Sequence, residues 1–95
     1  MARLSEAEIS DKLQHLAGWS RAGSSIERQF TFKSFVPAMA FVNRVAEAAE
    51  RANHHPDITI NYNRVTMALS THSAGGITQN DFDLAQQINR LESAP

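Results

Sequence analysis

Three histidines in the second half of the chain are the residues best suited to chemistry. His54 and His55 stand side by side before Pro56, and His72 follows at the end of an alternating segment. Imidazole has an ordinary pKa of about 6.5, so it can donate and accept protons at neutral pH. Three such groups brought together could carry out general acid–base catalysis. The fourth histidine, His15, lies among polar residues of a helical pattern, which is typical of a solvated surface position.

Two other interpretations of the three histidines have to be weighed. Three histidines can bind zinc and leave one coordination position open. Adjacent histidines followed by proline are not a usual ligand spacing, however, and no carboxylate stands in the HExxH arrangement. The side chains could also be polar loop residues that share no task, and spacing alone leaves that interpretation open. The chain has no cysteine, which excludes disulfides, thiolate metal sites and cysteine nucleophiles.

The pattern around the histidines predicts how they meet. Alternating residues before and after Tyr62-Asn63 indicate a β-hairpin with these two residues as its turn. In that register the numbers of facing residues add up to 125, so His72 lies opposite residue 53 and His55 opposite residue 70. All three histidines are then expected at the open end of the hairpin. Because successive residues of a strand point to opposite faces, His54 and His55 can share one face of the sheet only if the corner before the strand rotates one of them, as such a corner can.

Two carboxylates accompany these histidines. Glu50 lies one helical turn before His54, where it could accept a hydrogen bond from an imidazole or be a solvated carboxylate on a helix. Asp81 follows Thr78 by three residues, in a stretch that fits a capping box at a helix start. We expect Asp81 to cap that helix, whatever else it does.

The periodicity of the apolar residues predicts the elements that position this site. Ser5 and Glu8 fit a capping box, and Gly18 is placed to end the helix that begins there. Ser34 is the N-cap candidate of a long helix, which must stop before Pro56 because proline disfavours helical geometry in the preceding residue. The predicted elements are a helix over 5–16, strands over 19–22 and 26–32, a helix over 35–53, strands over 58–61 and 64–71, and a final helix that begins near 78.

This order, α-β-β-α-β-β-α, predicts an α+β fold. The simplest arrangement is a two-layer sandwich, in which a four-stranded antiparallel sheet carries three helices on one face. The chain of 95 residues has the length of one domain, which we assign to residues 1–95. Arg28 is an exception within strand 26–32, because it falls on the apolar face. Only Glu27 and Arg28 would protect that strand if it formed an open edge of the sheet.

Composition excludes several classes of function. Nine basic residues face ten acidic ones without a basic cluster, so we expect no nucleic-acid partner. The longest apolar run, over 35–42, is much shorter than the roughly 20 residues of a membrane span, so we expect no membrane partner. The first residues contain no apolar signal core, and we expect a cytoplasmic protein.

The stretch from Glu50 to Asp57 resembles the signature of the pterin-4a-carbinolamine dehydratases. That family carries His-His-Pro with an acidic residue four positions earlier, then an aromatic residue, a histidine and an aspartate at set spacings. Here Tyr62, His72 and Asp81 match these positions. Ile58 departs from the family, which often has an aromatic residue there. Further segments similar to the family are Gly18-Trp19, 30–35, Ser70-Thr71-His72 and Gly75-Gly76-Ile77-Thr78.

The resemblance implies the fold predicted above and also a reaction. The reaction is the loss of water from 4a-hydroxytetrahydropterin, a hydro-lyase reaction that gives quinonoid dihydropterin and serves the recycling of tetrahydrobiopterin. It requires protonation of the leaving hydroxyl and removal of a proton from a ring nitrogen, which two imidazoles in opposite protonation states can provide. No metal or organic cofactor is implied.

Carried over by position, the resemblance gives each residue a role. His54 and His72 would be the acid–base pair, and His55, the third member of the catalytic set, would mainly hold and orient the pterin. Glu50 and Asp81 would support them. The residues expected to line the substrate are Asn53, His54, His55, Ser70, Thr71, His72 and Ser73.

The resemblance also implies partners. The substrate is a small pterin, a functional link to an aromatic amino-acid hydroxylase is expected, and the chain is expected to form a homodimer or homotetramer through sheet edges and helices. Animal members of the family also serve as dimerization cofactors of a homeodomain transcription factor. A non-catalytic module for pterin binding or for dimerization is therefore the alternative function.

Overall fold

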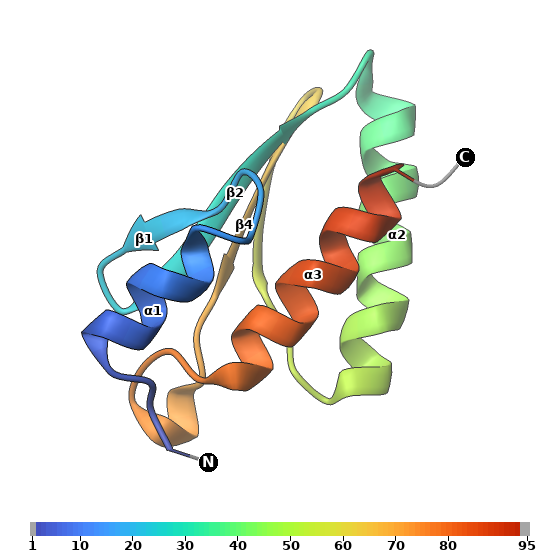
Figure 1. The fold of residues 1–95 in the computed structure, drawn as a ribbon. Coiled ribbons are helices and arrows are strands. Elements are labelled where there is room, and N and C mark those ends of the chain that lie inside the picture. Colours follow the sequence, from blue (N-terminus) through green and yellow to red (C-terminus); the bar gives the residue numbers. More distant parts are fainter. Residues whose placement is uncertain (1, 94–95) are drawn as a thin grey trace.

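The computed structural model describes residues 2–93 and places three helices on one face of a four-stranded antiparallel sheet (Figure 1). This confirms the predicted fold class and the order of its elements. The structure also contains a short 3₁₀-helix after the fourth strand, which was not predicted. The elements are α1 (Glu6–Leu13), β1 (Ser20–Ala22), β2 (Ser25–Thr31), α2 (Phe35–Ala52), β3 (Asp57–Asn61), β4 (Arg64–Leu69), η1 (His72–Ala74) and α3 (Gln79–Ser93).

The strands lie in the order β1-β2-β4-β3. In the second hairpin, Asp57 faces Ala68 and Asn61 faces Arg64, so the predicted register is confirmed. Its turn contains Tyr62, whose φ is 54°. The suggestion that residues 26–32 form an open edge is wrong, because β2 pairs with β1 on one side and with β4 on the other. The edges of the sheet are β1 and β3.

The helix ends show both confirmed and corrected details. At the start of α1 the Ser5 N–H donates to Glu8 Oε1 at 2.8 Å and the Glu8 N–H donates to Ser5 Oγ at 3.1 Å, as the capping box predicts. The hydrogen bond from the Ser5 N–H to the carboxylate, helped by the nearby Ser5 hydroxyl, holds the pKa of Glu8 below its usual value. The helix ends at Leu13 instead of residue 16, because the next amides bond three residues back and tighten the chain into turns.

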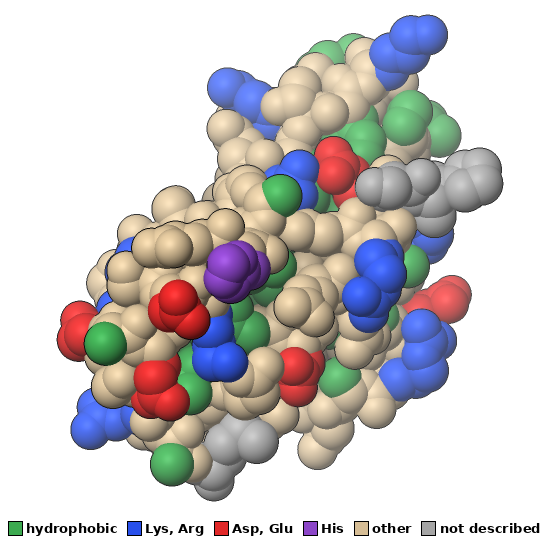
Figure 2. Space-filling view, in the orientation of Figure 1, with side chains coloured by type: hydrophobic (Ala, Val, Ile, Leu, Met, Phe, Trp, Pro, Cys, Tyr) green, Lys and Arg blue, Asp and Glu red, His purple; other side chains and the backbone are tan. Residues whose placement is uncertain are grey.

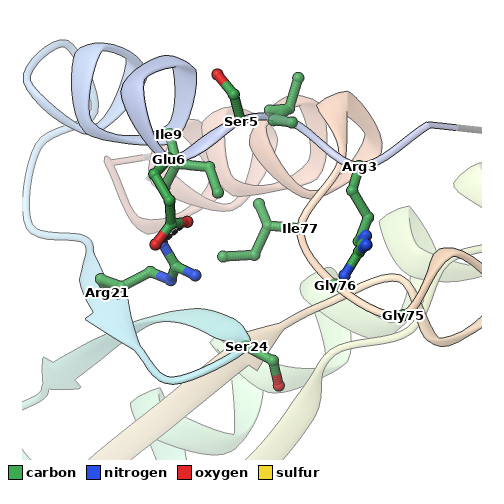
Figure 3. Close-up of a pocket in the computed structure, with 10 residues that line it drawn as sticks. Arg3, Ser5, Glu6, Ile9, Arg21, Ser24, Gly75, Gly76 and Ile77 are labelled. Atoms are coloured by element: carbon green, nitrogen blue, oxygen red, sulfur yellow. Dashed lines mark hydrogen bonds and ion pairs between the residues drawn. The ribbon is translucent and has the colours of Figure 1, made fainter.

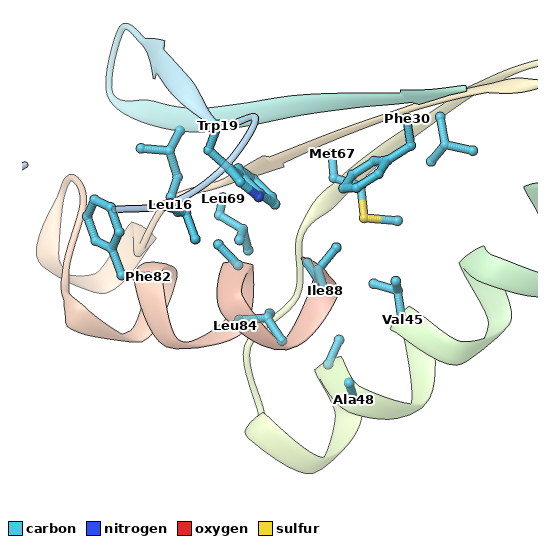
Figure 4. Close-up of a cluster of buried hydrophobic side chains, with 14 of the residues drawn as sticks. Leu16, Trp19, Phe30, Val45, Ala48, Met67, Leu69, Phe82, Leu84 and Ile88 are labelled. Atoms are coloured by element: carbon cyan, nitrogen blue, oxygen red, sulfur yellow. The ribbon is translucent and has the colours of Figure 1, made fainter. Parts of the chain in front are cut away.

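A shared apolar core fills the space between the sheet and the helices (Figure 4). The ring centroids of Phe30 and Phe41 are 4.8 Å apart, which joins β2 to α2, and Trp19 lies edge-on to Phe30 at 6.3 Å. All three helices contribute to or flank this core. Its labelled members in Figure 4 are Leu16, Trp19, Phe30, Val45, Ala48, Met67, Leu69, Phe82, Leu84 and Ile88.

Arg28 occupies the apolar face of β2 because its charge is compensated. Its guanidinium carbon lies 4.4 Å from the centroid of the Phe30 ring, within the range of a cation–π interaction. It donates to the carbonyl oxygen of Ala17 at 3.2 Å and to Asn89 Oδ1 at 2.6 Å, and it forms an ion pair with Glu92 at 3.1 Å. Arg28 therefore connects β2 to the loop after α1 and to α3.

The face of the molecule that Figure 2 shows agrees with the charge distribution expected from the sequence. On the face that Figure 2 shows, acidic and basic side chains are interspersed. In residues 2–93 no helix has the length and apolar character to cross a membrane.

The close approach of Gly18 to Arg28 gives a stability prediction. Gly18 has a φ of +86°, and a Cβ there would lie 2.4 Å from Arg28 Nε, whereas Gly23 has a φ of +62° and open space around it. Both changes to alanine strain the backbone, which costs about 1 kcal/mol, but only Gly18→Ala also displaces Arg28, at about 1–3 kcal/mol more. Urea unfolding checks this, and equal losses in the two variants would contradict it.

Candidate active site

The predicted site lies at one end of the sheet, where the last turn of α2 leads into β3. The helix ends at Ala52 and is capped by Asn53, whose φ of 50° is in the left-handed region that asparagine tolerates better than most residues. The His54 N–H still bonds back to the carbonyl oxygen of Ala49 at 3.1 Å. After this corner the side chains of His54 and His55 bond to different elements, α3 and α2 respectively. The corner therefore directs the two histidine side chains to different helices.

His54 is bonded to a buried carboxylate. Its Nε2 lies 2.5 Å from Asp81 Oδ1, and the side chains are 13% and 0% exposed, respectively. A carboxylate accepts hydrogen bonds, so this contact places the imidazole hydrogen on Nε2. Nδ1 is then the nitrogen left to exchange a proton with another molecule.

Asp81 is held by two further donors on its other oxygen. The Thr78 N–H donates to Oδ2 at 2.8 Å, which confirms the predicted capping role at the start of α3, and the Thr71 hydroxyl donates to Oδ2 at 3.0 Å. Thr71 is buried, and its hydroxyl also contacts that of Thr78 at 2.8 Å. Sequence reasoning assigned Thr78 no role in the site, and the signals that pointed to it were its place in the capping box and in a segment similar to the family.

His55 and Glu50 form a second pair on the surface. His55 Nε2 contacts Glu50 Oε2, and the side chains are 58% and 76% exposed, respectively. Glu50 thus bonds to His55 and not to His54, the histidine one turn after it. The reason is the left-handed corner at Asn53, which carries His54 toward α3. An exposed contact of this kind contributes little to stability.

His72 begins η1, directly after the buried Thr71, and its side chain is exposed. The loop that follows is closed by two backbone hydrogen bonds between Thr71 and Gly76, at 2.8 and 3.3 Å. Thr71 bonds to Asp81, and Asp81 bonds to His54. These contacts join the segment after β4, the start of α3 and the corner after α2. The other predicted substrate-lining residues lie at the same end: exposed Asn53 at the corner, half-buried Ser70 after β4 and exposed Ser73 in η1.

A cavity of about 390 Å³ lies on the far side of the loop after η1 and is separate from the histidines. Figure 3 shows its lining, in which Arg21 is paired with Glu6 and Arg3 lies against Gly76. His54, His55 and His72 do not line it. The candidate site is instead the open surface around these histidines. Within residues 2–93 no three His, Asp or Glu side chains are grouped so that they could hold a metal ion.

The fold and the site together define a class of protein. It is a small α+β domain with histidines at one sheet end, two of them paired with carboxylates, an arrangement suited to proton transfer. Comparison with known proteins makes the class specific. The chain belongs to the pterin 4 alpha carbinolamine dehydratase family, whose model matches residues 2–91.

Full-length relatives support this membership. The chain is 57% identical over 93 residues to a protein of Thermomicrobium roseum provisionally named a pterin-4-alpha-carbinolamine dehydratase, covering 98% of this chain and 100% of that one. A protein of Thermosynechococcus vestitus with the same provisional name is 53% identical over 94% of each chain.

Two solved structures share the fold. The transcriptional coactivator/pterin dehydratase of Brucella melitensis has a TM-score of 0.91 and 38% identity, covering 95% of this chain and 98% of that one. A pterin dehydratase-like protein described as a RuBisCO assembly factor of the alpha-carboxysome has a TM-score of 0.70 and 21% identity, covering 85% and 96%, and shows the likeness of fold alone.

The difference in burial between the two carboxylates gives a second prediction. Asp81→Asn keeps the shape of the side chain, but its amide cannot accept hydrogen bonds on both sides, so at least one buried donor loses its acceptor. We expect the free energy of unfolding to fall by about 1–3 kcal/mol. The exposed counterpart Glu50→Gln serves as the control and should change it by less than about 0.5 kcal/mol.

Chemical denaturation of the two variants measures the difference. An Asp81→Asn variant as stable as the wild-type protein would contradict this prediction. An equal loss of unfolding free energy in Glu50→Gln would also show that the buried hydrogen bonds of Asp81 do not stabilise the fold as expected.

Proposed function

We propose that this protein is a 4a-hydroxytetrahydropterin dehydratase, a hydro-lyase that gives quinonoid dihydropterin and water. The observation that carries the proposal is the His54 imidazole held by the buried Asp81 carboxylate, which is itself bonded to the residue before His72. Membership of the pterin dehydratase family supports the substrate class. The proposed function also implies that the product returns to the tetrahydrobiopterin pool of an aromatic amino-acid hydroxylase.

The reaction transfers two protons and breaks one bond. One histidine of the pair His54 and His72 protonates the 4a-hydroxyl, the C4a–O bond breaks, and water leaves. The other histidine takes a proton from a ring nitrogen, so that a carbon–nitrogen double bond forms. His54 has Nδ1 available for this exchange, because Asp81 binds Nε2. The exposed side chain of His72 is accessible to a bound molecule.

The remaining site residues would bind and orient the pterin. His55 is exposed and held by Glu50, so it can present its ring to a planar ligand. Asn53, Ser70 and Ser73 lie at the same sheet end and offer polar groups to it. In this proposal Glu50 and Asp81 do not touch the substrate and act through the histidines that they bind.

Replacing the paired histidines tests the catalytic roles. A positioned acid or base contributes on the order of 10²–10⁴-fold in rate, so His54→Ala and His72→Ala should each lower kcat for dehydration by at least tenfold. His15→Ala is the matched control, because His15 is an exposed histidine in the loop after α1. Stopped-flow or coupled assays measure kcat, and circular dichroism verifies the fold.

Wild-type kcat in both site variants would refute the catalytic assignment. Tight pterin binding without turnover by the wild-type protein would favour the alternative function, a non-catalytic pterin-binding or dimerization module. The Brucella melitensis relative, described as a coactivator and a dehydratase, gives a reason to test that alternative.

We also propose that the chain forms a homodimer or homotetramer. Strand β3 is an edge of the sheet, and an open edge favours pairing with another strand. Apolar side chains are exposed near it and at the start of α2, where Ile60, Tyr62, Phe35 and Val36 are 37%, 63%, 48% and 74% exposed. Contact with another copy would remove this apolar surface from water.

Light scattering at micromolar concentration tests the assembly. We expect a mass of two or four times the 10.5 kDa of one chain, because a small domain gains buried apolar surface from oligomerization. A mass of 10.5 kDa at every concentration would refute it.

A further inference from the structure

The hydroxyl groups of Thr71 and Thr78 form a buried pair beside Asp81. Thr71 is 7% exposed and Thr78 is 0% exposed. Their Oγ1 atoms are 2.8 Å apart, and the Thr71 hydroxyl donates to Asp81 Oδ2 at 3.0 Å. A hydroxyl has one hydrogen, so Thr78 must be the donor to Thr71. The Asn80 N–H in turn donates to Thr78 Oγ1 at 3.2 Å. The hydrogen bonds therefore run in one direction, from Asn80 through both hydroxyls to Asp81.

This chain of hydrogen bonds fixes the orientation of the Asp81 carboxylate. Its Oδ2 atom accepts from the Thr71 hydroxyl and from the Thr78 N–H, which leaves Oδ1 facing His54 Nε2. A carboxylate with donors at both oxygens cannot rotate without breaking one of these bonds. The geometry of His54 thus depends on two hydroxyls that do not touch it.

We propose that Thr71 and Thr78 are positioning residues of the dehydratase site. Their hydroxyls hold Asp81 so that the hydrogen of the His54 ring stays on Nε2 and Nδ1 stays available to the substrate. The inference rests on the proposed function for its effect on rate. It assigns Thr71 a role different from the substrate contact expected from the sequence, because its hydroxyl is occupied by Asp81 and Thr78.

Capping of α3 does not by itself explain this arrangement. A cap needs the Thr78 hydroxyl, which accepts from Asn80, and the Asp81 carboxylate, which accepts from the Thr78 N–H. Thr71 belongs to the segment after β4, and its backbone is already bonded to Gly76. Its hydroxyl therefore gives Asp81 a further donor, which the helix cap does not require. Asp81 is the residue whose side chain binds His54.

Removing each hydroxyl while keeping the side-chain shape tests the proposal. In Thr71→Val and Thr78→Val we expect kcat to fall roughly tenfold while KM changes by less than about twofold, because neither side chain touches the substrate. Thr71→Ser and Thr78→Ser keep the hydroxyl and should restore most of the rate. Thr31→Val is the control, since Thr31 is an exposed threonine at the end of β2, which is not an edge strand, and it should leave kcat unchanged.

A second measurement reads the His54 ring without any substrate. Nitrogen-15 and proton NMR of histidine-labelled protein identifies which ring nitrogen carries the hydrogen in the neutral form. We expect Nε2–H in the wild-type protein and a larger fraction of Nδ1–H in both valine variants. This result does not require turnover, so it tests the positioning role even if the protein is not a dehydratase.

Three outcomes would overturn the proposal. Valine variants that lose stability but keep the wild-type kcat and ring state would show a purely structural role for the hydroxyls. A raised KM at unchanged kcat would show that Thr71 contacts the substrate. Hydrogen on Nδ1 in the wild-type protein would contradict the proposed orientation directly, and this measurement decides the matter even if a valine variant does not fold.

Discussion

The burial of the Asp81 carboxylate is the constraint on which this end of the molecule depends. An ionised carboxylate removed from water without partners costs several kcal/mol, so it is found buried only where donors surround it. Here the donors come from the start of α3, the segment after β4 and the corner between α2 and β3. These three segments must therefore meet correctly for the carboxylate to be tolerated. The same contacts position His54, so stability and the proposed chemistry share one group.

The parts of the site that the sequence predicted are those set by local geometry. The alternation of side chains in a hairpin has a period of two, and a two-residue turn fixes the register, so the meeting of the histidine-bearing ends followed from the position of Tyr62-Asn63. The cap formed by Asp81 followed from a spacing of three residues to Thr78. In both cases the relative positions of the residues follow from local structure, which is a single hairpin in the first case and a single helix start in the second.

The parts that the sequence did not predict depend on packing between distant segments. Arg28 contradicted the apolar pattern of its strand, and its partner Asn89 lies 61 residues further along the chain. The partner of Glu50 depended on the direction of the chain after Asn53, which a left-handed residue decides and a helical pattern does not reveal. The interior place of β2 depended on its pairing with β4, since sequence patterns specify hairpins more readily than the order of hairpins in a sheet.

The candidate site lies at only one of the two ends of the hairpin formed by β3 and β4. The histidines lie where its strands join α2 and η1, whereas the turn at Tyr62 is at the opposite end of both strands (Figure 1). One residue inserted into either strand would turn every side chain beyond it to the other face of the sheet. Residues added between Asn61 and Arg64 would leave the facing pairs in place. An insertion at the turn would consequently disturb the hydrogen bonds between Asn63 and Phe32 and the proposed contact between copies, while the geometry around His54 and His72 is preserved.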